Sequence, residues 1–227
     1  MELPLSDISD REILDARPAR NSLDVDRPYE FLVEPERGAD GLIEHVATIF
    51  LVNRECSFRC LMCDLWKNTT VESVPVGDIP QQLDYALERS PKAQHAKLYN
   101  SGNFFDAKAI PKEDWPAIVE RVRGFKSIIV ENHPKLCGDD CFEFRDMLAV
   151  HGVELEIALG LETVHPEVLP RLNKQMTAED FAFTAEKLIA AGIRLRTFIL
   201  LRPPFLSEEE GIEWALKSIE FAFEAGV

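Results

Sequence analysis

Short apolar segments alternate along most of the chain with longer segments whose apolar residues recur at helical spacing. The apolar segments, which we expect to be strands, are residues 46–52, 95–101, 126–132, 155–160 and 194–201. The segments between them predict helices near residues 78–90, 111–124, 139–151 and 177–192, with a last helix from Ser207 onward. This alternation predicts an α/β fold with a parallel sheet, because a parallel connection must cross over the sheet and usually does so as a helix.

Three of the expected helices begin with a capping signal, a residue whose side chain can accept a hydrogen bond from the backbone N–H of the first turn. The pairs are Thr177 with Asp180, Ser207 with Glu210, and Asp78 with Gln81. Apolar residues that recur on one helical face are Phe181, Ala185, Leu188 and Ile189 in one helix, and Ile212, Leu216, Ile219 and Phe223 in the last.

Five βα units predict a partial barrel with its helices outside, and residues 45–227 are expected to form this core domain. Residues 1–44 are expected to form an N-terminal extension, with a short helix near residues 6–16 and a hairpin around Gly38 and Gly41. The last expected helix is followed by no strand. We therefore expect that the sixth unit of the barrel is missing and that the chain is part of a longer protein.

At 227 residues, of which 46% are hydrophobic, the chain can form one substantial core. Its formal net charge of −15 argues against a self-contained nucleic-acid surface, which needs clustered Lys and Arg. The apolar segments are far too short to cross a membrane, and the N-terminus lacks the basic-then-apolar order of a secretion signal. We therefore expect a cytoplasmic protein with no membrane partner.

Three of the five cysteines, Cys56, Cys60 and Cys63, directly follow the first expected strand. An odd number of cysteines with three close together does not indicate a disulfide framework, so metal binding is favoured. Zinc would need a fourth ligand nearby, and the available Asp64 and His95 are poorly placed. Three thiolates around a cubic [4Fe–4S] cluster would instead leave the fourth iron open for a ligand. A zinc or iron–sulfur module without turnover is the alternative.

The C-x3-C-x2-C spacing of these cysteines, after the first strand of a βα array, resembles the signature of radical S-adenosylmethionine (radical SAM) enzymes. The resemblance covers roughly residues 45–227 and implies a [4Fe–4S] cluster whose open iron binds SAM. It further implies an electron donor such as flavodoxin or ferredoxin, reductive cleavage of SAM, and hydrogen abstraction from a substrate by the 5′-deoxyadenosyl radical. Met62 stands where the family often has an aromatic residue against the adenine.

The ends of the later strands hold the other candidate cofactor contacts. Ser101, Gly102 and Asn103 stand where the family commonly has a Gly-Gly-Glu-like turn that contacts the amino group of SAM. Glu162 follows the fourth expected strand by two residues, and the resemblance implies that it binds the ribose hydroxyls. Arg202 would meet the carboxylate of SAM or the substrate. Each residue would also fit an ordinary turn or loop that binds no ligand.

Residues 131–133, after the third expected strand, are candidates for facing the substrate. Among them His133 could carry a proton near neutral pH. Cys141 lies on the apolar face of the following helix and is expected in the core, whereas Cys137 in the preceding loop is either a plain loop residue or a redox or ligating thiol. The sequence names no catalytic side chain.

Four segments carry a closer resemblance, to the radical SAM branch that contains the Elongator catalytic subunit and the archaeosine-forming tRNA enzymes. They are KLYNSGNFFD, VENHP, GLETVHPEVLPRLNKQMT and RTFILLRPPFLSEEEG. This resemblance implies a tRNA base or its adduct as the substrate, for which the acidic net charge gives no independent support. We expect a radical SAM enzyme, and a tRNA-modifying protein of this branch is the narrower alternative.

Overall fold

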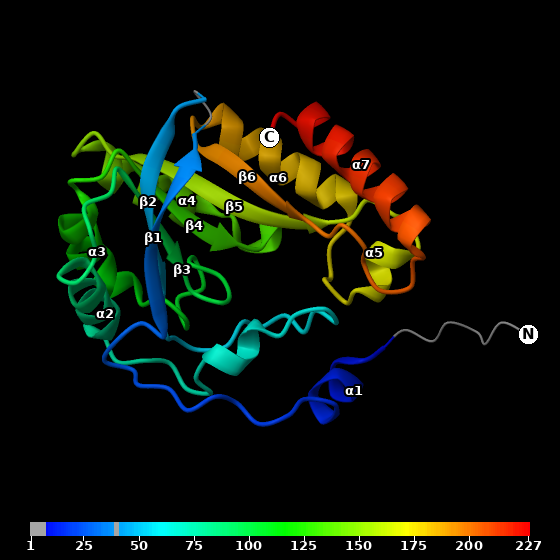
Figure 1. The fold of residues 1–227 in the computed structure, drawn as a ribbon, viewed down its shortest axis with the longest axis horizontal. Helices are drawn as coiled ribbons and strands as arrows, with labels where there is room; N and C mark the ends of the chain where they lie inside the picture. The colour runs from blue at the N-terminus through cyan, green and yellow to red at the C-terminus, as the bar shows by residue number, and fades with distance from the viewer. Residues whose placement is uncertain (1–7, 39–40) are drawn as a thin grey trace, which may run out of the picture.

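A curled six-stranded sheet forms the centre of the protein (Figure 1). The structure, a computed structural model, describes residues 8–38 and 41–227. The strands lie in chain order, with β1 antiparallel to β2 and each later strand parallel to the one before it. The strands are β1 (Glu30–Arg37), β2 (Ile43–Phe50), β3 (His95–Tyr99), β4 (Ser127–Asn132), β5 (Glu154–Glu162) and β6 (Arg194–Ile199). The predicted α/β class is confirmed.

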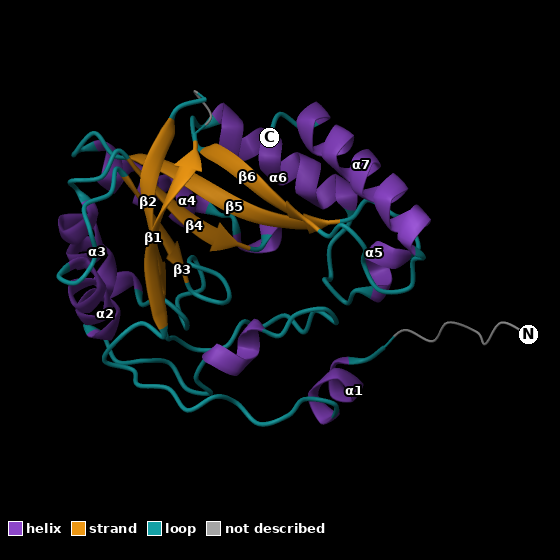
Figure 2. Cartoon of the chain, in the orientation of Figure 1, coloured by secondary structure: helices purple, strands orange, loops and turns teal. Residues whose placement is uncertain are grey.

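The helices surround this sheet (Figure 2). The α-helices are α1 (Asp10–Asp15), α2 (Asp78–Leu87), α3 (Trp115–Val122), α4 (Asp139–Ala149), α5 (Val168–Arg171), α6 (Ala178–Ala190) and α7 (Glu208–Glu224). Three 3-10 helices are η1 (Leu65–Asn68), η2 (Lys112–Asp114) and η3 (Pro134–Leu136). None of the helices among residues 8–38 and 41–227 combines the length and the hydropathy needed to span a membrane.

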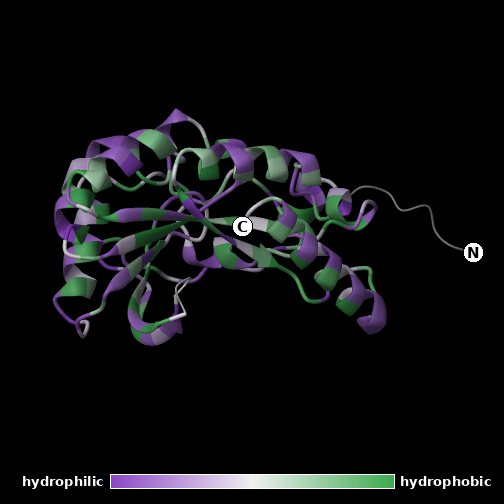
Figure 3. Cartoon of the chain, turned by 90° about the horizontal axis from the view of Figure 1, so that it is seen from above, coloured by the Kyte–Doolittle hydropathy of each residue, from purple (hydrophilic) through white to green (hydrophobic). Residues whose placement is uncertain are grey.

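Successive residues of each strand face opposite sides of the sheet. Figure 3 shows that both hydrophilic and hydrophobic residues occur along the strands. On the outer side, residues such as Leu98 and Ile157 belong to one buried apolar core under the helices. On the inner side, charged residues pair across strands: Lys97 binds Glu36, and Arg196 binds both Glu156 and Glu36. The concave side of the sheet therefore carries charged side chains together with aromatic ones such as Tyr99 and Phe198, whereas the convex side is apolar.

The sheet curls far enough for its two edge strands to interact. Nη1 of Arg196 on β6 lies 3.7 Å from Oε2 of Glu36 on β1, although four strands separate β1 from β6 in the sheet. This curvature agrees with the expected partial barrel. The expected hairpin is also confirmed, since β1 and β2 pair around Gly38 and Gly41, while residues 39–40 between them lie outside the described residues.

The N-terminal 44 residues contribute β1 and the start of β2 to the sheet, and α1 lies within the expected helix near residues 6–16, of which Ser6 and Asp7 lie outside the described residues. The division into residues 1–44 and 45–227 stays a prediction. The side chain that caps α1 is Ser9, which accepts a hydrogen bond from the backbone N–H of Glu12.

Two of the three expected helix caps are confirmed, because Thr177 with Asp180 and Ser207 with Glu210 form reciprocal capping boxes. The cap at Asp78 is wrong. This residue is the first of α2, and the residue before it, Gly77, occupies the cap position at a φ of 102°. The left-handed backbone suits glycine there, and glycine has no side chain with which to cap the helix.

The apolar row of α7 is exposed rather than buried. Its large side chains are 40–70% exposed, and the residues that face the protein are instead Gly211, Ala215, Ser218 and Ala222. Ile189 of α6 is likewise 37% exposed, whereas the other expected core residues of that helix are buried. Helical spacing identifies an apolar face of α7, but that face is not the one that packs on the protein. The face with small residues packs instead, because small side chains allow the helix to approach the sheet closely.

We expect Leu98→Ala to lower the free energy of unfolding by roughly 2–5 kcal/mol, because Leu98 is fully buried in the middle of β3 and its truncation leaves a cavity. Urea denaturation followed by circular dichroism measures this change. Val150→Ala serves as the control, since Val150 is 81% exposed and its truncation should change the free energy by no more than about 0.5 kcal/mol. Equal effects of the two substitutions would contradict the described core.

Candidate functional site

A cavity of about 410 Å³ lies where the parallel strands end, between the sheet and the loop that follows β2. Each of the strands β2 to β6 contributes to its lining or is followed directly by residues that do. The predicted site residues that line it are Cys56, Cys60, Met62, Cys63, Ser101, Gly102, Asn103 and Glu162. Residues distant in sequence thus meet at one cavity, and the roles predicted for them stay predictions.

The cysteine loop, residues 51–64, has no regular secondary structure, and backbone hydrogen bonds to other segments hold it. The N–H of Glu55 donates to the carbonyl of Thr70 at 2.9 Å, and the N–H of Leu61 donates to the carbonyl of Leu172 at 2.8 Å. Cys56, Cys60 and Cys63 are all free and partly buried. The loop therefore presents three thiols to the cavity from a backbone that is fixed on both sides.

Burial raises the pKa of all three thiols above the ordinary value, and that of Cys60 to about 12. Negative charge on one thiolate also raises the pKa of its neighbours, since each disfavours a second nearby anion. In the free protein all three groups are therefore neutral thiols near pH 7. Converting them to thiolates requires a cationic centre at the site, which is what a metal or iron–sulfur cluster provides.

The donor set fits an iron–sulfur cluster on its chemistry, because three soft sulfur ligands from one loop line one cavity wall. Asn103 adds a polar contact to one of them, as its Nδ2 donates to Sγ of Cys56 at 3.0 Å. Within the described ranges, no three His, Cys, Asp or Glu side chains converge to hold a single metal ion. A [4Fe–4S] cluster makes a different demand, since each cysteine would bind a different iron.

The turn after β3 lies directly against the cysteine loop. A Cβ atom added to Gly102 would be 3.4 Å from Cβ of Cys56, so the two backbones approach closely. Ser101 has a φ of 52°, and its hydroxyl lies 3.1 Å from the hydroxyl of Tyr29, which also lines the cavity. Tyr29 comes from the N-terminal 44 residues, and no pattern in the sequence connects it with the site.

Glu131, at the end of β4, holds this turn from the other side. Its Oε1 accepts hydrogen bonds from the backbone N–H groups of Asn100 at 2.7 Å and of Gly102 at 3.2 Å. The side chain lines the cavity, and the protein packed around it keeps water away, which raises the pKa of the carboxyl to about 7. Glu131 thus combines support of the Ser101–Asn103 turn with a carboxyl group at the cavity.

His133 lies in the connection after β4, as a histidine before a proline more often does, and it is not placed to carry a proton near neutral pH. Its ring stacks on Phe58 with the centroids 3.8 Å apart, and both of its nitrogens are engaged: Nε2 lies 2.9 Å from the carbonyl of Lys174, and Nδ1 accepts from the N–H of Lys135. Burial, together with the nearby charge of Lys174, lowers the pKa of His133 to about 4. It is therefore a neutral part of the cavity wall.

A buried ion pair forms another part of this wall. Nζ of Lys174 lies 2.9 Å from Oε1 of Glu162, and both side chains are about nine-tenths buried. A Cβ added to Gly160 would lie within 2.5 Å of both groups, so a larger residue there would displace the pair. Glu162 is the last residue of β5, at a φ of 67°, rather than two residues beyond the strand.

Lys174 is a site residue that the sequence analysis misses. Its signal is only a lysine in the NKQM segment before α6, which α5 and its flanking loops separate from Glu162. Glu162 lies on the same side of β5 as Ala158 and Gly160, facing this lysine, and the register of β5 against β6 shifts between Gly160 and Glu162. Neither the shift nor the path of the loop can be predicted from residue types.

Arg202 does not line the cavity. It is exposed, and its side chain lies against Gly211 in the first turn of α7. Cys141 is fully buried, which confirms its assignment to the core. Cys137 accepts a hydrogen bond from Nδ2 of Asn132 at 3.2 Å, so it lies behind the cavity wall rather than in its lining.

Curated proteins with significant sequence similarity support the closer resemblance. An archaeosine synthase subunit beta of Thermococcus kodakarensis is 33% identical over 54% of this chain, and that of Methanosarcina acetivorans is 26% identical over 72% of it. An uncharacterised protein of Methanocaldococcus jannaschii is 25% identical over 91% of it. The matches cover 39%, 49% and 60% of these relatives, so the chain spans about half of their length. The predicted similarity to archaeosine-forming proteins is confirmed.

No protein-family model matches the chain. Among solved structures, the cobalamin-dependent S-adenosylmethionine radical enzyme OxsB aligns with a TM-score of 0.49 at 17% identity, over 76% of this chain and 26% of that one. The Elp3 protein of Methanocaldococcus infernus aligns with a TM-score of 0.45 at 16% identity, over 66% of this chain and 38% of that one.

The raised pKa of Glu131 predicts a pH dependence of stability. The carboxyl has a pKa near 7 in the folded protein and near 4.5 in the unfolded chain, so between these pH values the folded protein binds more protons. The free energy of unfolding therefore falls as the pH rises from 4.5 to 7. We expect the free energy of unfolding of Glu131→Gln to rise relative to the wild type between pH 4.5 and 7, by up to roughly 3 kcal/mol.

Urea denaturation of the metal-free proteins at several pH values measures the difference. His133 has the opposite effect over part of this range, because its pKa is lowered, but it is present in both proteins and cancels. A difference that does not change with pH would show that Glu131 titrates normally.

Proposed function

We propose that this chain binds a [4Fe–4S] cluster and SAM as part of a radical SAM enzyme. The observation that carries the proposal is that the three cysteines and the strand-end residues line one cavity of about 410 Å³. Cys56, Cys60 and Cys63 would hold the cluster, and the chemistry that a cluster supplies when bound is one-electron reduction. The proposal also rests on the resemblance of the motif to radical SAM enzymes and on the archaeosine synthase relatives.

The other side chains of the cavity would bind and orient SAM. The carboxyl of Glu131 at the cavity wall offers, when ionised, an acceptor for a cationic group of the ligand, and the Ser101–Asn103 turn offers backbone and side-chain oxygens beside it. Glu162, fixed by Lys174, would accept from the ribose hydroxyls. Met62 would lie against the adenine. Arg202, outside the cavity lining, stays a proposed contact with the substrate.

The substrate class that we propose is a tRNA base or its adduct. The support for it is the pair of relatives named as archaeosine synthase subunits, of which the chain spans less than half in each case. A small electron-transfer protein such as flavodoxin or ferredoxin would supply the electron. The competing function is a metal-binding module without turnover.

Anaerobic reconstitution with iron and sulfide tests the main proposal. We expect the wild type to take up about four irons, to develop the visible absorption of an iron–sulfur cluster, and to release 5′-deoxyadenosine from SAM in the presence of dithionite. Cys60→Ser should lose all three properties, because it removes one of three ligands. Cys137→Ser is the matched control, since this cysteine lies outside the cavity lining. Uptake of a single zinc without visible absorption would instead support the metal-binding module.

Gly102→Val should weaken SAM binding by roughly tenfold or more, which corresponds to about 1.4 kcal/mol. The Cβ of the valine would already lie 3.4 Å from Cβ of Cys56, so its two methyl groups would enter the space between the turn and the cysteine loop. Equilibrium binding of SAM to the reconstituted protein measures the effect. Gly124→Val is the control, because a Cβ at Gly124 meets nothing within 4 Å. Unchanged affinity in Gly102→Val would remove the turn from the proposed SAM site.

A further inference from the structure

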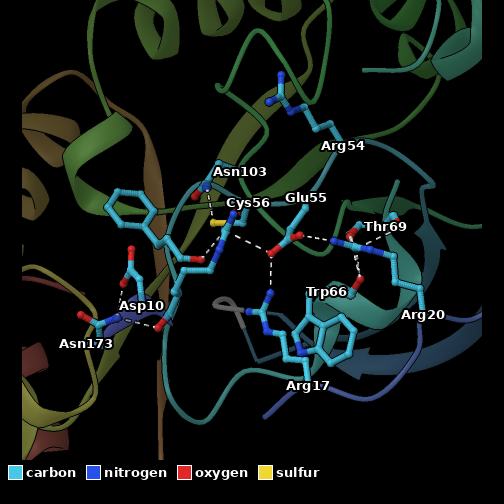
Figure 4. A network of polar contacts seen from close by, with 12 residues as sticks. Asp10, Arg17, Arg20, Arg54, Glu55, Cys56, Trp66, Thr69, Asn103 and Asn173 are labelled. Atoms are coloured by element: carbon cyan, nitrogen blue, oxygen red, sulfur yellow. Dashed lines mark hydrogen bonds and ion pairs between the residues drawn. The ribbon is translucent and has the colours of Figure 1, made fainter. Parts of the chain in front are cut away.

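The residue before the first cysteine of the loop is the centre of an ionic cluster (Figure 4). Oε1 of Glu55 lies 2.6 Å from Nη1 of Arg17 and 3.1 Å from Nη1 of Arg59, and its Oε2 binds Nη2 of Arg20. One carboxylate therefore contacts three guanidinium groups. Glu55 and Arg17 have side chains that are only 10% exposed, so the cluster is largely shielded from solvent.

Two of these arginines come from the segment that precedes β1. We call residues 9–28 the N-terminal strap, because they run across the side of the cysteine loop away from the sheet (Figure 1). The guanidinium of Arg17 lies 4.7 Å from the ring centroid of Trp66, and Arg20 donates to the carbonyl of Trp66 at 2.6 Å and to Oγ1 of Thr69 at 2.8 Å. The strap thus contacts the chain both before and after the three cysteines.

The third arginine belongs to the cysteine loop itself. Nη1 of Arg59 also donates to the carbonyl of Cys56, which closes the turn between the first two cysteines. The carbonyl of Arg59 in turn accepts from Nδ2 of Asn173 at 2.9 Å, and the same amide donates to Oδ1 of Asp10 in α1 at 2.6 Å (Figure 4). The backbone of the loop is therefore held through side chains of Glu55 and Asn173 at successive points.

We propose that Glu55 is a positioning residue, which uses the N-terminal strap to hold the cysteine loop in the shape that presents its three thiols to a cluster. The proposal rests on the proposed function in taking these cysteines as cluster ligands. A loop without regular secondary structure loses conformational entropy when three of its side chains must converge on a cluster. A loop that ionic contacts already fix loses less conformational entropy when the cluster binds.

The cluster of charges also has an electrostatic consequence. One carboxylate among three guanidinium groups leaves a net positive charge beside the cysteines. Because a reduced iron–sulfur cluster carries more negative charge than an oxidised one, this positive charge favours the reduced state. Arg59, between two of the cysteines in sequence and bonded to the carbonyl of Cys56, is the arginine best placed to exert this effect.

The test compares Glu55→Gln, which keeps the shape of the side chain but removes its charge, with Glu72→Gln, an exposed glutamate outside the ionic cluster. In the metal-free protein, we expect the three cysteines of Glu55→Gln to react with iodoacetamide roughly tenfold faster than in the wild type, because loosening of the loop exposes them. In the reconstituted protein, we expect a chelator to remove iron from Glu55→Gln roughly tenfold faster. Glu72→Gln should match the wild type in both assays.

A second variant separates positioning from a general loss of stability. Arg59→Gln leaves the contacts of Glu55 with Arg17 and Arg20 in place, and we expect it to lower the reduction potential of the bound cluster. If Glu55→Gln lowers the urea midpoint of the whole protein, its own alkylation rate no longer separates a loosened loop from global instability. The reduction potential of the cluster and the alkylation rate of the cysteines in Arg59→Gln then decide between these two explanations.

The proposal would be overturned if the cysteines of Glu55→Gln are alkylated, and its iron released, at the same rates as in the wild type. If Glu55→Gln is globally unstable, the proposal would also be overturned by an Arg59→Gln variant whose cluster reduction potential and cysteine alkylation rate equal those of the wild type. A wild type that binds no iron would overturn the proposed function, while the alkylation assay of the metal-free proteins would still decide whether Glu55 holds the loop.

Discussion

The parallel pairing of β2 to β6 is the constraint on which the site depends. Because the chain runs the same way in each of these strands, the residues after them all emerge at one end of the sheet. The cysteine loop after β2, the Ser101–Asn103 turn after β3 and the Glu131 carboxyl of β4 meet there without any of them being close in sequence. The alternation of side chains then gives the two faces of the sheet separate roles, an apolar core outside and a cavity with charged and aromatic side chains inside.

Inside the concavity, the charges are arranged so that most are paired. Lys174 pairs with Glu162, and Lys97, Arg196, Glu36 and Glu156 pair with one another deeper in the curl of the sheet. His133 is neutral because burial and the nearby charge of Lys174 lower its pKa. Glu131 differs, since both hydrogen bonds that its carboxyl accepts come from backbone N–H groups rather than from a cation. It is therefore the acidic group of the cavity that is best placed to respond to a positively charged ligand.

Much of this arrangement could be predicted from the sequence, and the reasons are physical. Buried parallel strands are recognisable as continuous apolar segments, and the capping boxes at Thr177 and Ser207 mark helix starts by local chemistry. The cysteine spacing is a local pattern too, so it points to a loop that does line the cavity. What these signals share is that neighbouring residues in the chain generate them.

The features that sequence analysis misses depend on the path of the chain in space. Glu55 has partners 38 and 35 residues away in Arg17 and Arg20, and a glutamate next to a cysteine has no composition signal that distinguishes it from a solvated one. The predicted helix from Ser207 onward is confirmed as α7, but its sequence leaves open which face packs, for a related reason. Two faces of that helix are visible in its sequence, but the choice between them depends on how closely the helix approaches β6.

The contact between Arg196 and Glu36 has a consequence for how the protein responds to salt. These two side chains join the first and last strands of the sheet and are 35% and 28% exposed, so dissolved ions reach them. Mobile ions weaken such a pair far more than they weaken the enclosed pair of Lys174 and Glu162. Added salt therefore weakens the link between the two edge strands more than it weakens the charge pair in the cavity wall.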